Sequence, residues 1–443
     1  MLSPAEQTDP MGDDFHIVQS TGCILSPGST LSLVNLLGRG TQGSAYHVRS
    51  LDAQEYALKL YHSSTLEKDK TIHSRLKRLV SIGSPSPAFC WALDYLEVVH
   101  QGSTFYGYLM RLRKPDYISP AAFLNGACQM DFKPLFTACL NLADSFAQLH
   151  LRGLCYKDVS INNFFFNPNT GECSIIDIDN ICYDSEYDYS ANVLGTPRFM
   201  APEIVQGEAK PSIYTDYHSL AVLIFYLLLR GNPLEGVRES KVKIFDAAAQ
   251  KYLYGADATY IFDLNESSNR PDPDVHGAVL YMANILPESL MATFDSAFSQ
   301  GLHDPSRRVP DSKWSIELRR IIDSITHCPS CGQENFSSMS SSDSIRCWEC
   351  GSDFAPIRIQ FQESEYLASP SLSIESDGRS IATVIRHPND RTILGLRNDT
   401  DFVWQATLPD EKTSKVPPGK SIIIGSGIVL DTQTPGATML KIL

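Results

Sequence analysis

Residues 161–180, "INNFFFNPNTGECSIIDIDN", place three phenylalanines between a pair of asparagines and a pair of aspartates. Phe164–Phe166 and Ile175–Ile176 are typical of short buried strands, and the Asn-Pro-Asn-Thr-Gly run between them is typical of a turn. The pattern predicts a hairpin with Asn163 and Asp177 at its open end. The two side chains can then share a Mg²⁺ ion, which prefers such hard oxygen ligands.

The composition excludes several classes of protein. The chain has 443 residues, of which 43% are hydrophobic and 20% charged, and its net charge is -14. An acidic chain is disfavoured for non-specific nucleic-acid binding and for attraction to anionic membranes. The longest apolar run, Leu220–Leu229, is too short to span a bilayer. Without a signal-peptide pattern at the N-terminus, we expect a cytoplasmic protein.

Hydrophobic periodicity divides the chain into parts of different secondary structure. Strand patterns dominate residues 31–110, interrupted by one helical segment at about 68–80, and helical patterns dominate up to residue 325. The sequence therefore predicts an α+β fold with a cleft between a strand-rich and a helix-rich lobe. The expected parts are a flexible N-terminal segment (1–30), the two lobes (about 31–110 and 111–325), a cysteine module (326–355) and a small all-β domain (356–443).

Three more features lie in the two expected lobes. Gly38, Gly40 and Gly43 form a G-x-G-x-x-G pattern between two strand patterns, which favours a hairpin over phosphates rather than a dinucleotide-binding turn. Lys59 is centred in the strand pattern "YALKLY", which suggests that it faces a cleft, although a solubilising lysine on an edge strand is the alternative. Asp158 precedes the hairpin and could accept the proton of an attacking hydroxyl.

In order and spacing, these motifs resemble a protein kinase over residues 31–325. The resemblance rests on the glycine pattern, Lys59, "YKDVSINN", "DID", "GTPRFMAPE" and "DPSRR". It implies a bilobal, ATP- and Mg²⁺-dependent enzyme that phosphorylates serine or threonine in proteins. The implied catalytic residues are Lys59, Asp158, Asn163 and Asp177; the implied nucleotide-binding residues are Gly38, Gly40, Gly43, Lys59 and Met110; Asn163 and Asp177 would bind Mg²⁺. It also implies a Glu203–Arg308 ion pair and an Asp216 that caps the catalytic loop.

The departures from the family pattern bear on activity. Tyr156 and Lys157 replace the usual histidine and arginine, and Asp179 replaces a glycine. The helix after Lys59 should supply a glutamate, yet its matching positions hold a histidine and a serine. If the enzyme is active, we expect Glu67 within salt-bridge reach of Lys59; otherwise Lys59 pairs only with Asp177.

The segment that follows Asp177 is acidic. Asp184, Glu186 and Asp188 alternate with tyrosines and serines. These acids could imitate phosphorylation and keep an enzyme active, or they could simply form a solvated loop face.

The cysteine module has the spacing of a metal site. Cys328, Cys331, Cys347 and Cys350 form two C-x₂-C pairs, each followed by a glycine. Four thiolates favour tetrahedral, structural Zn²⁺, and disulfides or an iron–sulfur cluster are the alternatives. Arg346 is the single basic residue between the pairs, so the predicted zinc ribbon favours a protein-docking or spacer role over nucleic-acid binding.

The domain order is similar to kinases of the tellurium-resistance-associated phosphorylation systems, which are bacterial. That resemblance implies two partners besides the protein substrate, a metal-dependent phosphatase and a von Willebrand A-type protein. The strand-and-turn rhythm of residues 356–443 also fits a forkhead-associated-like phosphothreonine reader. Three functions remain open: an active kinase, a nucleotide-binding pseudokinase scaffold, and an adaptor acting through its zinc and β domains.

Overall fold

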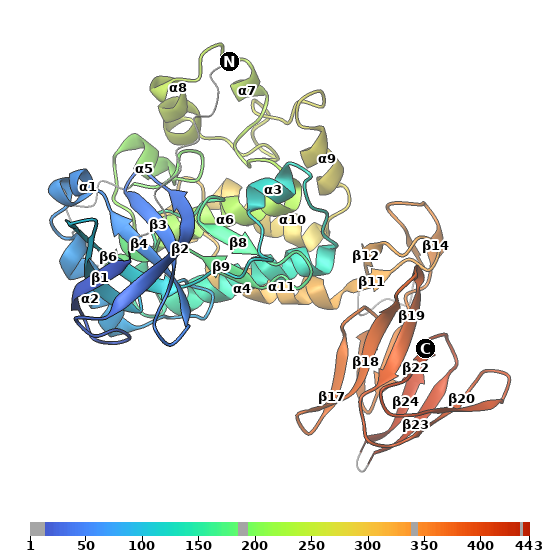
Figure 1. Ribbon diagram of the computed structural model, residues 1–443. Helices are drawn as coiled ribbons and strands as arrows, with labels where there is room; N and C mark the ends of the chain where they lie inside the picture. The colour runs from blue at the N-terminus through green and yellow to red at the C-terminus, as the bar shows by residue number, and fades with distance from the viewer. Residues whose placement is uncertain (1–13, 185–193, 338–343, 435–436) are drawn as a thin grey trace, which may run out of the picture. The chain divides into compact units, whose positions relative to one another are not determined.

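The computed structural model describes residues 14–184, 194–337, 344–434 and 437–443 (Figure 1). These residues form two compact units. The first unit comprises Met1–Gln129, Ala138–Met282 and Ala292–Ser315, and the second comprises Met130–Thr137, Ala283–Met291 and Ile316–Leu443. Each unit is described by itself below.

Six strands of the first unit close into an antiparallel barrel in the order β1-β2-β3-β4-β6-β5 (Figure 1). Buried aliphatic side chains such as Leu31, Val48, Leu58 and Leu96 fill it, because alternate residues of each strand point inward. The strands are β1 (Phe15–Ser20), β2 (Thr30–Arg39), β3 (Gly43–Arg49), β4 (Glu55–Tyr61), β5 (Asp94–His100) and β6 (Ser103–Arg111).

Strand β1 corrects the expectation that residues 1–30 form a flexible segment. It pairs with β2 and with β5, and thereby closes the barrel. Phe15 and Ile17 are buried in the core, whereas the residues beside them are exposed. The alternation spans only a few residues, which is too short to distinguish a strand from an irregular segment by pattern alone.

The helix predicted at about 68–80 corresponds to α2 (Ile72–Ile82), and a separate short helix, α1 (Ser63–Lys68), precedes it. They are separated at Asp69, whose backbone is extended. Helix α2 buries Ile72, Leu76 and Leu79, whose spacing places them on one face of the helix.

Helices dominate the chain from residue 120 to residue 323. Helix α6 is buried along most of its length and begins with a capping box formed by Ser212 and Thr215. In the described residues, no helix is long and apolar enough to cross a membrane. The helices are α3 (Pro120–Leu124), α4 (Phe132–His150), α5 (Pro202–Gln206), α6 (Ile213–Leu229), α7 (Val237–Ser240), α8 (Ala247–Lys251), α9 (Gly277–Ala283), α10 (Glu288–Asp295) and α11 (Asp311–Asp323).

Two small sheets lie among these helices. Strand β8 (Phe164–Phe166) pairs with β9 (Cys173–Ile175), and β7 (Leu154–Cys155) pairs with β10 (Cys182–Tyr183). The first pair is the hairpin expected from the sequence. The second links the start of the loop that carries Asp158 to the segment after Asp177.

The second unit contains two kinds of β structure. Two hairpins, β11–β12 and β13–β14, carry the clustered cysteines. Ten further strands form a six-stranded sheet (β16-β15-β24-β23-β20-β21) and a four-stranded sheet (β17-β18-β19-β22), with Trp404, Leu396 and Leu430 in their shared core. The bounds are β11 (Ile325–His327), β12 (Glu334–Phe336), β13 (Ile345–Arg346), β14 (Asp353–Phe354), β15 (Arg358–Phe361), β16 (Ser364–Leu367), β17 (Ser373–Ser376), β18 (Arg379–His387), β19 (Asp390–Asn398), β20 (Trp404–Thr407), β21 (Thr413–Val416), β22 (Ser421–Ile423), β23 (Val429–Thr434) and β24 (Ala437–Ile442).

Candidate active site

The β8–β9 hairpin brings Asn163 and Asp177 to its open end. Phe164 is paired with Ile175, and the Ile176 amide donates to the Asn163 carbonyl at 3.0 Å. Asp177 then leaves the hairpin in a left-handed conformation, with φ 55° and ψ 49°. This backbone reversal starts a short 3₁₀ turn, Ile178–Asn180, directly after Asp177.

Asp158 is oriented by two side chains. The Asn163 amide donates to Asp158 Oδ2 at 3.0 Å and to the Asp158 carbonyl at 2.9 Å. The Thr196 hydroxyl donates to Asp158 Oδ1 at 2.6 Å. Both carboxylate oxygens therefore have a donor, which fixes the direction of a side chain that could accept a proton.

Asp216, at the start of α6, holds the loop before Asp158. Its carboxylate accepts hydrogen bonds from the backbone amides of Tyr156 at 2.5 Å and Lys157 at 3.0 Å. The Tyr156 hydroxyl in turn donates to the Ile176 carbonyl. The buried Tyr156 side chain thus links the loop before Asp158 to the end of the hairpin before Asp177.

The hairpin of β2 and β3 carries the three glycines. A Cβ on Gly43 would lie 2.2 Å from the Leu60 carbonyl oxygen, so the packing of β3 on β4 requires glycine there. A Cβ on Gly38 would meet nothing within 4 Å, and one on Gly40 would come no closer than 3.7 Å to the Gly43 carbonyl. Packing therefore does not explain Gly38 and Gly40, whereas close approach of a ligand to the backbone would.

Lys59 extends from β4 and is buried. Its Nζ lies 3.0 Å from Asp177 Oδ1 and 2.9 Å from Asp179 Oδ2. Burial lowers the pKa of Lys59, but the charges of Asp179 and Asp177 outweigh that effect and raise the pKa. Lys59 is therefore cationic at neutral pH, and the edge-strand alternative does not apply.

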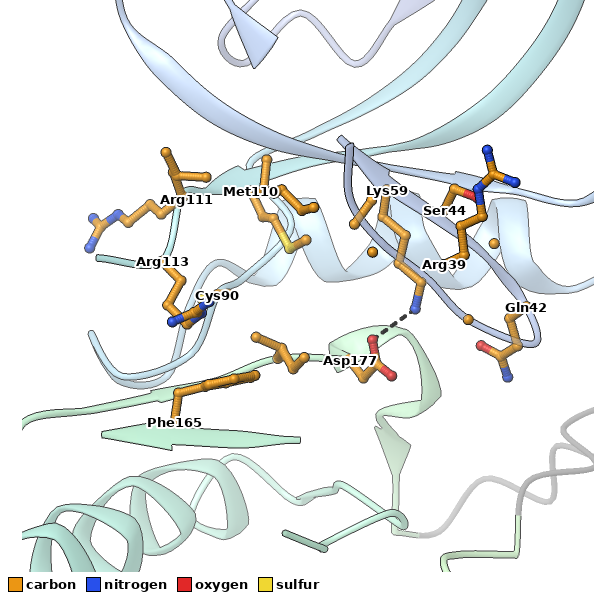
Figure 2. Close-up of a pocket in the computed structure, with 18 of the residues that line it drawn as sticks. Arg39, Gln42, Ser44, Lys59, Cys90, Met110, Arg111, Arg113, Phe165 and Asp177 are labelled. Carbon is orange, nitrogen blue, oxygen red and sulfur yellow. Dashed lines mark hydrogen bonds and ion pairs between the residues drawn. The ribbon is translucent and has the colours of Figure 1, made fainter. Parts of the chain in front are cut away.

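These elements enclose a pocket of about 510 Å³ in the first unit (Figure 2). Figure 2 shows Lys59 pointing from the strands toward Asp177; to the left of this pair, Met110 lies on the upper side of the pocket and Phe165 on its lower side. Of the predicted residues, Gly38, Gly40, Gly43, Lys59, Met110, Asp158 and Asp177 line the pocket. Asn163 is not among the lining residues; it lies behind Asp158 as its hydrogen-bond partner.

The protein kinase domain family matches residues 31–275, which is more than half of the chain. The chain belongs to the protein kinase family. Kinase domains use ATP and Mg²⁺ and act on protein substrates, and the pocket lies where the glycine hairpin, Lys59 and Asp177 meet.

The curated relatives that the chain matches are protein kinases of low identity. The chain is 26% identical to serine/threonine-protein kinase SCH9 of Candida albicans over 237 residues, 50% of this chain and 26% of that protein. It is 25% identical to the cGMP-dependent protein kinase of Eimeria tenella over 236 residues, 51% of this chain and 22% of that protein. It is 34% identical to protein kinase C-like 2 of Schizosaccharomyces pombe over 99 residues, 22% of this chain and 9% of that protein. The chain thus spans about a quarter or less of these relatives.

Two expectations about the kinase domain are confirmed. Glu203 accepts two hydrogen bonds from Arg308, each of 2.7 Å, so the pair is bidentate. Asp216 caps the catalytic loop, as described above.

The expectation about Glu67 is wrong. Glu67 is exposed near the end of α1, and the ion pairs of Lys59 among the described residues go to Asp177 and Asp179. Helix α1 ends before the chain turns into α2, so Glu67 belongs to a separate short helix. The alternative, pairing with Asp177 only, is also incomplete because Asp179 shares the ammonium group.

Sequence reasoning missed several residues of the pocket. Phe165 lines it, and the Arg113 guanidinium lies 4.3 Å from the centre of the Phe165 ring. Ala57 and Cys90 also line the pocket. The strand pattern marked Phe165 as apolar, but alternation alone does not say which face of a three-residue strand meets a cavity.

Part of the acidic segment lies outside the described residues. Asp184 is described, and its carboxylate accepts a hydrogen bond from the Ile213 amide at 2.7 Å. Glu186 and Asp188 fall outside the described residues. Asp184 is therefore tied to the start of α6.

The four clustered cysteines meet in the second unit. Their sulfur atoms all lie within 4.8 Å of one another, and all four are free thiols. Gly332 and Gly351 have φ values of 73° and 72°, and each amide donates back to the carbonyl of the first cysteine of its pair. Two matching turns thus present four soft ligands to one point, an arrangement compatible with zinc.

Proposed function

We propose that this chain is an ATP- and Mg²⁺-dependent kinase that transfers phosphate to serine or threonine hydroxyls of a protein. The observation that carries the proposal is the presence of Lys59, Asp158 and Asp177 around one pocket under the glycine hairpin. Phosphoryl transfer depends mainly on positioning and charge neutralisation, which these groups can supply.

Each residue has a role in the proposal. The glycine hairpin would cover the phosphates, Lys59 would bind them, and Met110 would contact the base. Asn163 and Asp177 would hold Mg²⁺, which supplies positive charge to the phosphates when bound. Asp158 would orient the attacking hydroxyl and accept its proton.

The test is transfer of labelled phosphate from ATP with Mg²⁺, to the protein itself and to serine-, threonine- and tyrosine-containing peptides. Asp158→Ala and Asp177→Ala should abolish labelling, and Asp52→Ala, an exposed acid in the β3–β4 turn, should not. Robust labelling by Asp177→Ala would contradict the site.

A nucleotide-binding pseudokinase scaffold is the second candidate. It is favoured by the exposure of Glu67 and the lack of an ion pair between Lys59 and helix α2 in the described residues. This candidate predicts nucleotide binding without phosphate transfer, so calorimetry beside the labelling assay separates the two.

The rest of the proposal concerns the context of the kinase. We propose the domain limits expected from the sequence, with β1 added to the strand-rich lobe, and a structural Zn²⁺ on Cys328, Cys331, Cys347 and Cys350. By resemblance, the chain would act in a bacterial, cytoplasmic tellurium-resistance-associated system with a metal-dependent phosphatase and a von Willebrand A-type protein. Co-purification with those two proteins tests the assignment.

A further inference from the structure

Lys59 has two carboxylate partners that differ in their surroundings. The Asp177 side chain is 41% exposed, whereas the Asp179 side chain is 3% exposed. Asp177 lines the pocket, where a metal ion could reach it; Asp179 does not line it. Asp179 is therefore the partner that Lys59 would keep if Asp177 bound a metal ion.

Asp179 is held from both sides. The Tyr61 hydroxyl, from the same strand as Lys59, donates to Asp179 Oδ2 at 2.5 Å. Arg75, from helix α2, donates its Nε–H to the Asp179 carbonyl oxygen at 2.6 Å.

Helix α2 therefore supplies a cation rather than an acid. Arg75 is buried and forms an ion pair with Asp69 at 2.8 Å, which fixes its guanidinium beside the 3₁₀ turn that carries Asp179. In protein kinases a helix glutamate pairs with the strand lysine, and that pair must be in place for activity. Here the helix contacts the backbone of Asp179, and the Asp179 side chain contacts the lysine.

We propose that Asp179 takes the place of the helix glutamate as the residue that positions Lys59 for the nucleotide phosphates. Lysine is a flexible point charge, so a fixed carboxylate is needed to give the ammonium group one direction. Tyr61 and Arg75 fix that carboxylate. The inference rests on the proposed kinase function, and Asp179 is a positioning residue because it acts through Lys59.

The variant that tests this is Asp179→Asn. Asp179 Oδ1 has no hydrogen-bond partner among the described residues, so an amide nitrogen can replace it while the other oxygen still faces Lys59 and Tyr61. The variant thus removes the charge and keeps the shape. Tyr61→Phe, which removes one hydrogen bond to the carboxylate, is the milder second variant, and Glu67→Gln is the matched control.

Asp179→Asn should lower kcat by about tenfold to a hundredfold, the loss expected for a hydrogen bond between charged groups, with a smaller change in the KM for ATP. Tyr61→Phe should lower kcat by a few fold, and Glu67→Gln should leave it unchanged. In a Lys59→Met background, Asp179→Asn should cause little further loss, because residues that act through each other are not additive. A wild-type kcat for Asp179→Asn, or the same loss with and without Lys59, overturns the inference.

A binding measurement decides the inference even if no phosphate is transferred. Without the Asp179 charge, Lys59 should compete with Mg²⁺ for Asp177, and the gain in ADP affinity on adding Mg²⁺ should fall by roughly tenfold. If the wild-type protein transfers no phosphate but Asp179→Asn shows this fall, the inference is supported and the proposed function is contradicted. An unchanged gain contradicts the inference alone, and a wild-type protein that binds no nucleotide contradicts both.

Discussion

His150, at the end of α4, is buried between two carboxylates. Its Nδ1 lies 2.5 Å from Asp311 Oδ2, and its Nε2 lies 3.2 Å from Asp216 Oδ2. Burial lowers the pKa of His150, but the hydrogen bonds to Asp216 and Asp311 outweigh it and raise the pKa to about 9. The imidazolium therefore links the residue that caps the catalytic loop to the start of α11.

This arrangement predicts a pH-dependent stability. Because the folded-state pKa of His150 exceeds its unfolded value, its contribution is complete below about pH 6.5 and is lost as the pH rises through about 9. The contribution is on the order of 3 kcal/mol. The measurement is urea unfolding of wild type and His150→Asn from pH 6 to pH 9.5.

The difference in unfolding free energy between wild type and His150→Asn should shrink as the pH rises. His16→Asn, which replaces an exposed histidine of β1, serves as the control. A difference that stays constant over this range would show that His150 is neutral in the folded protein.

The Glu203–Arg308 pair gives a second prediction at the scale of single residues. The Arg308 side chain is buried, so Glu203→Gln leaves an uncompensated buried charge and should cost about 3 kcal/mol of unfolding free energy. Glu203→Gln combined with Arg308→Met should cost less than Glu203→Gln alone. Lys114–Glu172 is an exposed pair of similar length, and Glu172→Gln should change stability little.

At the scale of elements, the glycines in the hairpin of β2 and β3 have two different roles. Gly43 is required by packing, whereas Gly38 faces open space. Gly43→Ala would press a methyl group against the Leu60 carbonyl and should destabilise the fold by about 1–3 kcal/mol. Gly38→Ala meets no atom within 4 Å and should leave the melting temperature unchanged while weakening nucleotide binding. Equal melting temperatures for the two variants would contradict this division.

Helix α2 and the turn after Asp177 also act together at this scale. Arg75 of the helix donates to the Asp179 backbone, and the Asp179 side chain forms an ion pair with Lys59. The helix is therefore connected to the lysine through the turn that follows Asp177. A movement of that segment would disturb both contacts at once.

At the scale of the whole molecule, the two units have separate hydrophobic cores. Zinc binding energy is folding energy for a module held by four thiolates. Chelation should therefore unfold the region of Cys328–Cys350 and leave nucleotide binding by the first unit intact. Metal analysis should find one zinc per chain in wild type and in Cys23→Ser, and none in Cys347→Ser.

Two results would contradict this prediction about zinc. Loss of nucleotide binding on zinc removal, measured by calorimetry, would show that the first unit depends on the cysteine module. Retention of zinc by Cys347→Ser would contradict the assignment of the ligands.

Local sequence patterns determined much of this protein. The turn residues between Phe166 and Cys173 close the hairpin that brings Asn163 and Asp177 together, because turn chemistry acts over a few residues. The two C-x₂-C pairs with their glycines form matching turns for the same reason. Helix α4 follows its apolar periodicity from Phe132 to His150.

Tertiary structure alone decided the partner of Lys59. Lys59 and Asp179 are 120 positions apart, and no periodicity connects a strand to a turn at that distance. The same holds for β1, whose short alternation becomes a strand only because β2 and β5 offer it an edge on each side. Such contacts depend on which surfaces remain open after the local elements have formed, and the three-dimensional packing of the chain decides that.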